Sequence, residues 1–237
     1  MEKVLVVKNI AREGPGLLGK ILSERGIGYD VVDADAGEPF PSPVDYAAVC
    51  VLGGPDSTND DTIKMKRELA RIKQTVEVGI PYLGVCLGMQ ALVKAMGGEV
   101  YRNPVREVGW RDPDGGYFII EPAEAGKADP FFSGIAPPYN IFHLHGETVT
   151  LPDKMELLAA GKWCENQVVR VKGKPAYGVQ GHLELTHEMF EEWLAQDPDL
   201  ALLDRSSLRA DYLSLRQAYE KRGIQALTNF LRIARLI

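Results

Sequence analysis

Short apolar runs alternate with longer amphipathic stretches up to residue 98, and this alternation constrains the fold more than any other feature of the sequence. The apolar runs, each of a length suited to a buried strand, lie at residues 4–7, 29–32, 47–52 and 81–85. Apolar residues recur at helical spacing over 15–25, 62–78 and 87–96. Strands that alternate with helices are typical of βαβ units. The sequence therefore predicts an α/β fold with an open, mostly parallel sheet flanked by helices.

The pattern changes after residue 98, where short strand-like runs predominate as far as residue 185. These runs, at 117–120, 155–159, 167–171 and 176–180, predict an antiparallel portion that completes the sheet. The pattern is then helical at 189–195, 200–222 and 224–237, and Gly223 is expected to break the last two helices. We therefore expect an α/β domain over 1–185 and a helical extension over 186–237 that packs on the same domain.

Charge and hydropathy argue against two kinds of partner. The chain has 27 Lys and Arg against 33 Asp and Glu, a net charge of -6, and its basic residues do not cluster. Nucleic acid and anionic membrane surfaces both require a basic patch, so neither is an expected partner. No apolar run approaches the ~18 residues that span a bilayer. Residues 1–3 lead directly into the first strand without a signal peptide, so we expect a cytoplasmic protein.

Cysteine and histidine spacing predicts neither a disulfide framework nor a metal site. Cys50, Cys86 and Cys164 are widely separated, and the four histidines contain no HExxH pair. Residues 14–20 fit the G-x-x-x-x-G-K pattern, but Ile21 cannot bind Mg²⁺ as the Ser or Thr of a phosphate-binding loop does. We therefore expect no metal, nucleotide or other cofactor.

The sharpest local pattern is G-x-C-x-G at residues 84–88, between an apolar strand and a helix. This is the arrangement of a nucleophile elbow with cysteine in place of serine. The dipole of the following helix favours the Cys86 thiolate, and the amide of Leu87 is placed to stabilise an oxyanion. A buried structural cysteine at an ordinary strand–helix turn fits the pentapeptide equally well, so the motif alone does not decide the function.

A cysteine nucleophile requires a base, and the base requires a group that orients it. His182 and Glu184 follow a strand-like run, and residues two apart at a strand end point to the same side. A lone histidine is more often structural, but the cysteine elbow upstream favours a catalytic pair. Gly53 and Gly54, directly after another strand, allow the close backbone approach that an oxyanion hole needs, although they also suit a plain turn.

Together these motifs resemble a known family. They comprise Gly53-Gly54-Pro55, Gly84-Val85-Cys86-Leu87-Gly88-Met89-Gln90 and His182-Leu183-Glu184, with further matches at 106–110, 143–147 and 166–167. In order and spacing the chain is similar to the class I (triad-type) glutamine amidotransferases, and most similar to stand-alone members related to the amidotransferase domain of GMP synthase. The resemblance runs from about Glu13 to Glu184 and implies a flavodoxin-like α/β fold.

The resemblance also implies a role for each matching residue. Cys86 would be the nucleophile, His182 the base and acid, and Glu184 the partner that orients the histidine. Gly54 and Leu87 would supply the oxyanion-hole amides. The residues that would hold the glutamine substrate are Gly53, Gln90, His145, Gly146 and Glu147.

The implied reaction is hydrolysis of the side-chain amide of glutamine to glutamate and ammonia through a cysteinyl thioester. We expect no synthetase domain in the residues after Glu184, so ammonia would pass to a separate synthetase; the apolar stripe of the C-terminal helices would also allow a homodimer. The alternatives are a γ-glutamyl peptidase or hydrolase that acts alone, and a catalytically silent metabolite-binding or regulatory domain.

One position departs from the family. Leu183 stands where the family usually has proline, and Gly181 stands where an aromatic residue is common. Proline fixes φ, so its replacement is expected to loosen the geometry between His182 and Glu184. Because both side chains are present, we expect activity to be retained at an altered rate or specificity.

Overall fold

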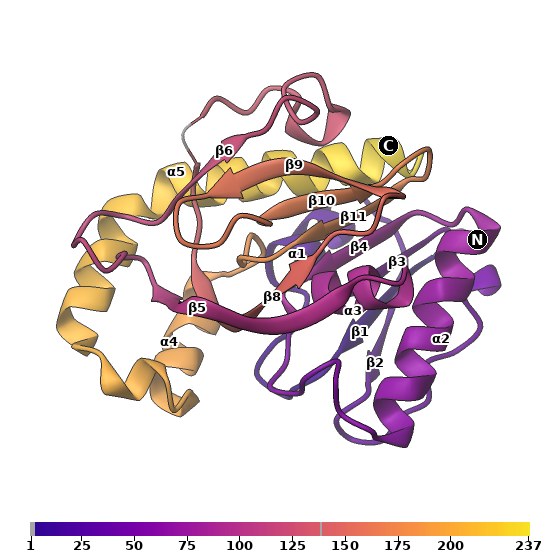
Figure 1. Cartoon of the computed structure of the whole chain (residues 1–237), viewed down its shortest axis with the longest axis horizontal. Coiled ribbons are helices and arrows are strands. Elements are labelled where there is room, and N and C mark those ends of the chain that lie inside the picture. The colour runs from indigo at the N-terminus through magenta and orange to yellow at the C-terminus, as the bar shows by residue number, and fades with distance from the viewer. Residues whose placement is uncertain (1–2, 138) are drawn as a thin grey trace.

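The computed structural model describes residues 3–137 and 139–237 (Figure 1). Met1 and Glu2, which were expected to lead into the first strand, lie outside the described residues, and the strand itself begins at Val4. Among the described helices, none is both long enough and apolar enough to cross a lipid bilayer.

Within the described residues, a nine-stranded sheet forms the centre of the molecule, in the order β2-β1-β3-β4-β11-β10-β9-β6-β7 (Figure 1). The parallel half contains β1 (Val4–Lys8), β2 (Tyr29–Asp33), β3 (Ala48–Val51), β4 (Tyr82–Val85) and β11 (Ala176–Val179). The antiparallel half contains β10 (Val168–Val171), β9 (Met155–Gly161), β6 (Ile119–Pro122) and β7 (Tyr139–Asn140). The predicted α/β sheet with an antiparallel portion is confirmed.

Helices cover both faces of the sheet because its central strands are apolar on both sides. In β1, Val4 and Val6 pack toward α1 (Gly16–Glu24) and α5 (Arg205–Ile233), whereas Leu5 and Val7 pack toward the opposite pair of helices. That pair is α2 (Ile63–Val78) and α3 (Leu87–Ala95). A third apolar cluster joins α4 (His187–Gln196) to the first half of α5 around a buried tryptophan. Short 3₁₀ turns lie at Pro43–Asp45, Pro130–Phe132 and Leu200–Leu202.

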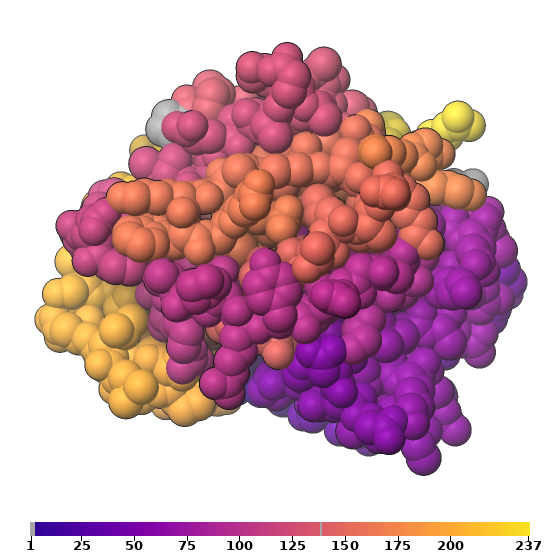
Figure 2. Space-filling model, in the orientation of Figure 1, coloured from indigo at the N-terminus to yellow at the C-terminus, as the bar shows by residue number. Residues whose placement is uncertain are grey.

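A separate antiparallel pair, β5 (Glu99–Gly109) and β8 (His143–Thr150), crosses beside the main sheet (Figure 1). In the space-filling view the magenta residues around β5 lie on the surface, between the purple N-terminal part and the orange strands (Figure 2). The register slips between Arg102 and Glu107, where the β5 backbone bulges. This pair was not predicted, because β5 is half polar and contains a proline, and β8 begins with two histidines.

The expected break at Gly223 is wrong, since α5 continues through this residue as one helix. Gly223 lies against the backbone of Leu183, and a Cβ on it would come within 2.3 Å of the Leu183 carbonyl oxygen. The glycine therefore allows two backbones to approach closely within a helix rather than ending the helix. The preceding residues, expected to be helical from 200 onward, form a 3₁₀ turn before α5 begins at Arg205.

Candidate active site

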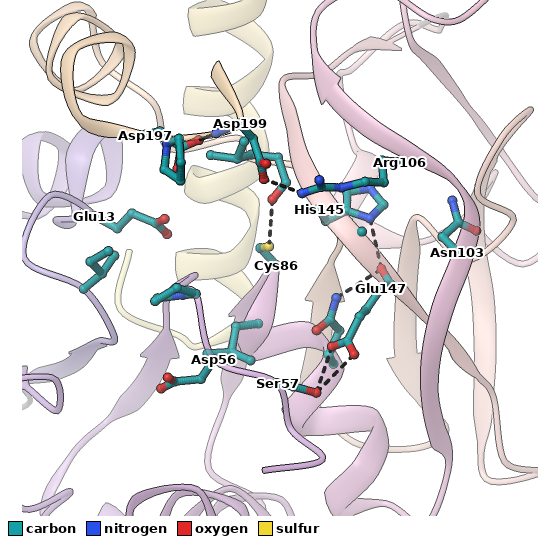
Figure 3. Close-up of a pocket in the computed structure, with 18 of the residues that line it drawn as sticks. Glu13, Asp56, Ser57, Cys86, Asn103, Arg106, His145, Glu147, Asp197 and Asp199 are labelled. Carbon is teal, nitrogen blue, oxygen red and sulfur yellow. Dashed lines mark hydrogen bonds and ion pairs between the residues drawn. The ribbon is translucent and has the colours of Figure 1, made fainter. Parts of the chain in front are cut away.

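The carboxyl ends of β1, β3, β4 and β11 meet at one edge of the sheet, where they border a cavity of about 900 Å³ (Figure 3). Open α/β sheets bind ligands at this edge, because the loops after adjacent parallel strands converge there. Cys86, directly after β4, lies among the residues that line the cavity.

The Cys86 backbone occupies a strained conformation, with φ 52° and ψ -107°, at the N-cap of α3. Its amide donates a hydrogen bond to the Val179 carbonyl at 2.8 Å, which ties the turn to β11. The flanking glycines have no room for a side chain. A Cβ on Gly84 would lie 2.3 Å from the Gly88 carbonyl oxygen, and one on Gly88 would lie 2.1 Å from the Val51 carbonyl oxygen. The turn is therefore a nucleophile elbow in its backbone geometry.

His182 and Glu184 form a buried hydrogen-bonded pair, with His182 Nδ1 2.8 Å from Glu184 Oε1. Burial lowers the pKa of His182, but the Glu184 carboxylate and the hydrogen bond with Cys86 together hold it well above its ordinary value. The amide of Leu183 donates to Glu184 Oε2 at 2.9 Å, so the carboxylate is held by two groups. The Leu183 amide thus gives this carboxylate a donor that proline, which has no N–H, would lack.

Three other elements fix the position of the His182 backbone and ring. The Tyr219 hydroxyl of α5 donates to the His182 carbonyl at 2.8 Å and accepts from the Leu185 amide at 3.1 Å. The His182 amide donates to the Phe142 carbonyl at 2.8 Å. The Trp193 ring of α4 packs edge-on against the imidazole, with 4.8 Å between centroids. The imidazole therefore has few alternative orientations.

Gly54 and Leu87, the predicted oxyanion-hole residues, both line the cavity with Cys86. Gly54 packs on Asn9, and a Cβ would lie 2.5 Å from the Cβ of that residue. Gly53, predicted to bind substrate, lies behind the lining instead. A Cβ there would lie 2.2 Å from Glu13 Oε2 and 3.1 Å from His182 Cε1, so glycine is required by close approach.

The other predicted substrate residues, Gln90, His145, Gly146 and Glu147, lie together on one side of the cavity. Gln90 Nε2 lies 3.2 Å from both the Glu147 carbonyl and Gln180 Oε1. Ser57 Oγ donates to the Glu147 carboxylate, with distances of 3.1 and 3.0 Å to its two oxygens. These bonds link α3, β8 and the loop after β3 into one wall (Figure 3).

Behind that wall, Glu107, His143 and His145 form a buried cluster whose potential ligand atoms all lie within 4.8 Å of one another. Its carboxylate is already engaged, since Glu107 Oε2 accepts from His145 Nε2 at 2.8 Å and from Gln167 Nε2 at 2.7 Å. Burial raises the pKa of Glu107, but the two histidines and Gln167 together lower it. Burial lowers the pKa of His143 to about 3, so this ring is neutral. The cluster has a metal-ligand composition, and its hydrogen bonds also orient His145.

Several residues at the site escaped sequence reasoning. Gln180 Nε2 lies 3.8 Å from Cys86 Sγ; its position two residues before His182 could have indicated it. Arg12 and Arg106 form ion pairs with Asp197 and Asp199, respectively, at the cavity rim. Glu13 and Ser57 carry no spacing signal, because each approaches the cavity from a different loop.

The signals that sequence reasoning discounted have structural explanations. Cys50 is buried in β3, where burial raises the pKa of its thiol, and burial raises the pKa of Cys164 to about 11. Gly16, in the G-x-x-x-x-G-K stretch, has φ 49°, and the next amide, that of Leu17, donates to the Glu184 carbonyl at 2.8 Å. His187 is half-buried and stacks on Tyr212.

Comparisons with known proteins identify the family to which the chain is similar. The family model for class-I glutamine amidotransferases matches residues 17–197. The glutamine amidotransferase-like protein YfeJ of Salmonella typhimurium is 30% identical over 185 residues, which cover 76% of this chain and 74% of that protein. A glutamine-hydrolyzing GMP synthase of Thermosipho melanesiensis is 26% identical over 215 residues, and the match takes in 90% of this chain but only 39% of that longer protein. The crystal structure of a glutamine amido transferase from Methylobacillus flagellatus superposes with a TM-score of 0.86 at 26% identity, covering 98% of this chain and 95% of the other.

Proposed function

This chain belongs to the class I glutamine amidotransferase family, and from that premise we propose that it hydrolyses the side-chain amide of glutamine to glutamate and ammonia. Cys86 is the proposed nucleophile, His182 the base and acid, and Glu184 the group that orients the imidazole. The observation that carries this proposal is the elbow. A cysteine with φ 52° caps a helix beside the cavity, and a buried histidine hydrogen-bonded to a carboxylate lies close enough for the Cys86 side chain to help raise its pKa.

In the proposed reaction, the Cys86 thiolate attacks the amide carbon and a C–S bond forms. His182 then gives its proton to the nitrogen, the C–N bond breaks, and ammonia departs from the thioester. Water attacks the thioester carbon while His182 takes one of its protons, and the C–S bond breaks to release glutamate. Gly54 and Leu87 amides would stabilise the oxyanion that forms in both steps.

The glutamyl part of the substrate is proposed to lie against the wall that contains Gln90, His145, Gly146 and Glu147. Support comes from their common position on one side of the cavity and from the hydrogen bonds that hold them. Ammonia is proposed to pass to a synthetase, by analogy with the glutamine-hydrolyzing GMP synthase that this chain matches over 39% of that protein's length.

A second candidate is a γ-glutamyl hydrolase that acts alone on larger amides. The cavity volume of about 900 Å³ favours this candidate, because it lies near the upper end of the ~300–1,000 Å³ typical for ligands larger than an amino acid. Both candidates use the same thioester chemistry, and they differ only in the group that leaves.

The experiment is a turnover assay on purified protein with glutamine and with γ-glutamyl peptides, in which ammonia, the released amine and glutamate are measured. Cys86→Ala should abolish hydrolysis and keep the fold, because it removes only the sulfur. Cys50→Ala changes a buried cysteine in the neighbouring strand and should leave turnover near wild type. Substantial turnover by Cys86→Ala would reject the proposed mechanism, and an inactive wild-type protein would favour a regulatory domain.

A further inference from the structure

Glu13, in the loop between β1 and α1, has a buried carboxyl group, and one of its two oxygens lacks a partner among the described residues. Its side chain lines the cavity, only 4% of the residue is exposed, and Oε2 has no hydrogen-bond donor among the described residues. A buried polar atom without a partner is costly, so such atoms are rare in folded proteins. Figure 3 shows the carboxyl group pointing into the cavity toward Cys86. The geometry points to a donor that arrives with the substrate.

Glu13 lies next to the catalytic imidazole. Gly53 separates the two groups, and a single methyl group on it would touch both Glu13 Oε2 at 2.2 Å and His182 Cε1 at 3.1 Å. The triad does not use Glu13, because Glu184 already occupies Nδ1 of the imidazole. Glu13 Oε2 therefore lies beside His182, the proposed acid that protonates the departing nitrogen. It takes no part in the hydrogen bond between His182 and Glu184.

The side of the cavity that Glu13 occupies indicates which part of the substrate it meets. In Figure 3, Glu13 lies on one side of Cys86, and His145 and Glu147 lie on the other side. An amide carbon at the sulfur carries its acyl chain and its nitrogen on separate bonds, which point to different sides of the sulfur. If the glutamyl chain lies toward Glu147, the nitrogen lies toward Glu13.

We propose that the carboxyl group of Glu13 binds the departing nitrogen of the substrate and selects the leaving group. This inference rests on the proposed hydrolysis of a γ-glutamyl amide. When His182 donates its proton to the nitrogen, the nitrogen gains positive charge before the C–N bond breaks. Glu13 accepts a hydrogen bond from that N–H and stabilises the charge, and no proton moves to Glu13 in this step. It is a binding and positioning group beside the triad.

Among the described residues, the charged groups around Glu13 form their ion pairs with other residues rather than with Glu13. They belong to His182, Glu184, Arg12 and Asp197, and the Arg12 guanidinium is already paired with Asp197 at 2.6 Å. Burial raises the pKa of Glu13 to about 7, with His182 acting in the opposite direction. The group therefore becomes negatively charged as the pH rises through neutrality. A leaving group that carries its own carboxylate should then be repelled, whereas ammonia and simple amines should not be.

The test compares two substrates that break the same bond but release different amines, γ-glutamylmethylamide and γ-glutamylglycine. The wild-type protein should prefer the methylamide, with a kcat/KM ratio that increases between pH 6 and pH 8 as Glu13 ionises. In Glu13→Gln the ratio should fall by about tenfold or more at pH 8, because one charge near the leaving group is removed, and its pH dependence should disappear.

Glu68→Gln is the matched control, since it makes the same chemical change in a second buried glutamate outside the cavity lining. It should leave the substrate ratio and its pH dependence unchanged. If Glu13→Gln does not fold, Glu13→Asp serves in its place; it keeps the charge and should keep the preference for the methylamide.

The possible results distinguish a failure of the role of Glu13 from a failure of the proposed hydrolysis. An active Glu13→Gln with the wild-type ratio, or a Glu13→Asp that loses the preference, would overturn the role of Glu13 and leave the triad mechanism intact. A wild-type protein that hydrolyses neither substrate nor glutamine would overturn the proposed function and this inference with it.

Discussion

At Leu183, where the family resemblance predicts proline, the backbone amide binds the carboxylate that holds the imidazole. The amide donates to Glu184 Oε2 at 2.9 Å, and the other carboxylate oxygen bonds to His182 Nδ1 at 2.8 Å. A leucine amide can therefore orient the carboxylate that holds the imidazole. The departure from the family exchanges a fixed dihedral angle for a charge-assisted hydrogen bond.

Leu183→Pro should consequently lower kcat and the melting temperature rather than raise them. Proline has no N–H, and a hydrogen bond to a charged acceptor is worth about 1.5–3 kcal/mol, which corresponds to a roughly tenfold or greater loss of turnover. Leu183→Ala is the control. It loses apolar contacts and stability but keeps the amide, so its kcat should stay near wild type. A stable Leu183→Pro with unchanged or higher kcat would contradict this account.

Gly53→Ala tests the close approach of Glu13 and His182 across one glycine. The added methyl group would lie 2.2 Å from Glu13 Oε2, so the carboxyl group or the loop must move. Overpacking of this kind costs about 1–3 kcal/mol, and displacement of groups beside the imidazole should lower kcat at least tenfold. Gly14→Ala, at a glycine where an added Cβ would meet nothing within 4 Å, should leave kcat and melting temperature near wild type. If Gly53→Ala and Gly14→Ala had the same kcat and melting temperature, the close contact of Glu13 and His182 across Gly53 would not matter for function.

At the residue scale, sequence reasoning finds the groups whose neighbours along the chain carry information. The glycines around Cys86 and the two-residue spacing of His182 and Glu184 are local patterns, and the structure brings all three residues together. Glu13 and Ser57 are single polar residues with no pattern around them. Only tertiary folding brings them to the cavity, so no local signal could have identified them.

At the scale of elements, α5 acts on the site through one hydroxyl group. Tyr219 donates to the His182 carbonyl and accepts from the Leu185 amide, so it holds the segment that carries the imidazole and its carboxylate. Gly223, one helical turn further, lets α5 approach the Leu183 carbonyl. The long helix is therefore a support for the active-site segment as well as a cover for the sheet.

Tyr219→Phe should reduce kcat several-fold and destabilise the protein by about 1–3 kcal/mol, because it leaves a buried carbonyl and a buried amide without partners. Thermal unfolding and glutamine turnover measure the two effects. Tyr212→Phe is the matched control from the same helix, since its hydroxyl bonds only to Glu220 among the described residues. An unchanged kcat in Tyr219→Phe would mean that the surrounding packing alone positions the segment.

The helices and strands that could be predicted well from the sequence are those in which apolar residues recur at a single regular spacing. The strands at 4–7 and 81–85 and the helices after them appear within a few residues of their expected limits. β5 was not predicted, because its surface position mixes charged and apolar residues without a clean alternation. The wrong break at Gly223 has the opposite cause, since a glycine needed for tertiary contact looks the same in sequence as one that ends a helix.

Across the whole molecule, two buried glutamates lack an ion-pair partner among the described residues, and both affect stability. Burial raises the pKa of Glu13 and of Glu68 to about 7, above the 4.5 that is usual for glutamate. Between these pH values the folded state binds more protons than the unfolded state. The contribution of these two groups to the free energy of unfolding should therefore fall as pH rises from about 4.5 to about 7 and level off above that.

Glu68→Gln isolates one of these contributions. Asn9 can still donate to the side-chain oxygen, so the variant should match wild type near pH 4.5. At pH 8 it should be more stable by up to about 3 kcal/mol, the equivalent of a shift of ~2.5 pKa units. Urea unfolding at both pH values measures the difference. Glu77→Gln, on the exposed side of α2, should show no such pH-dependent gain, and a wild-type-like pH profile in Glu68→Gln would contradict the assignment.

The support that α5 gives to His182 also has a consequence for how the protein is made. Synthesis proceeds from the N-terminus, and early elements fold as they leave the ribosome. Cys86 emerges with the parallel strands, His182 emerges much later, and the helix that holds the His182 backbone is the last described element to emerge. A nascent chain that already contains all three triad residues would therefore have its thiol without a correctly held base. Turnover would therefore begin only when α5 docks.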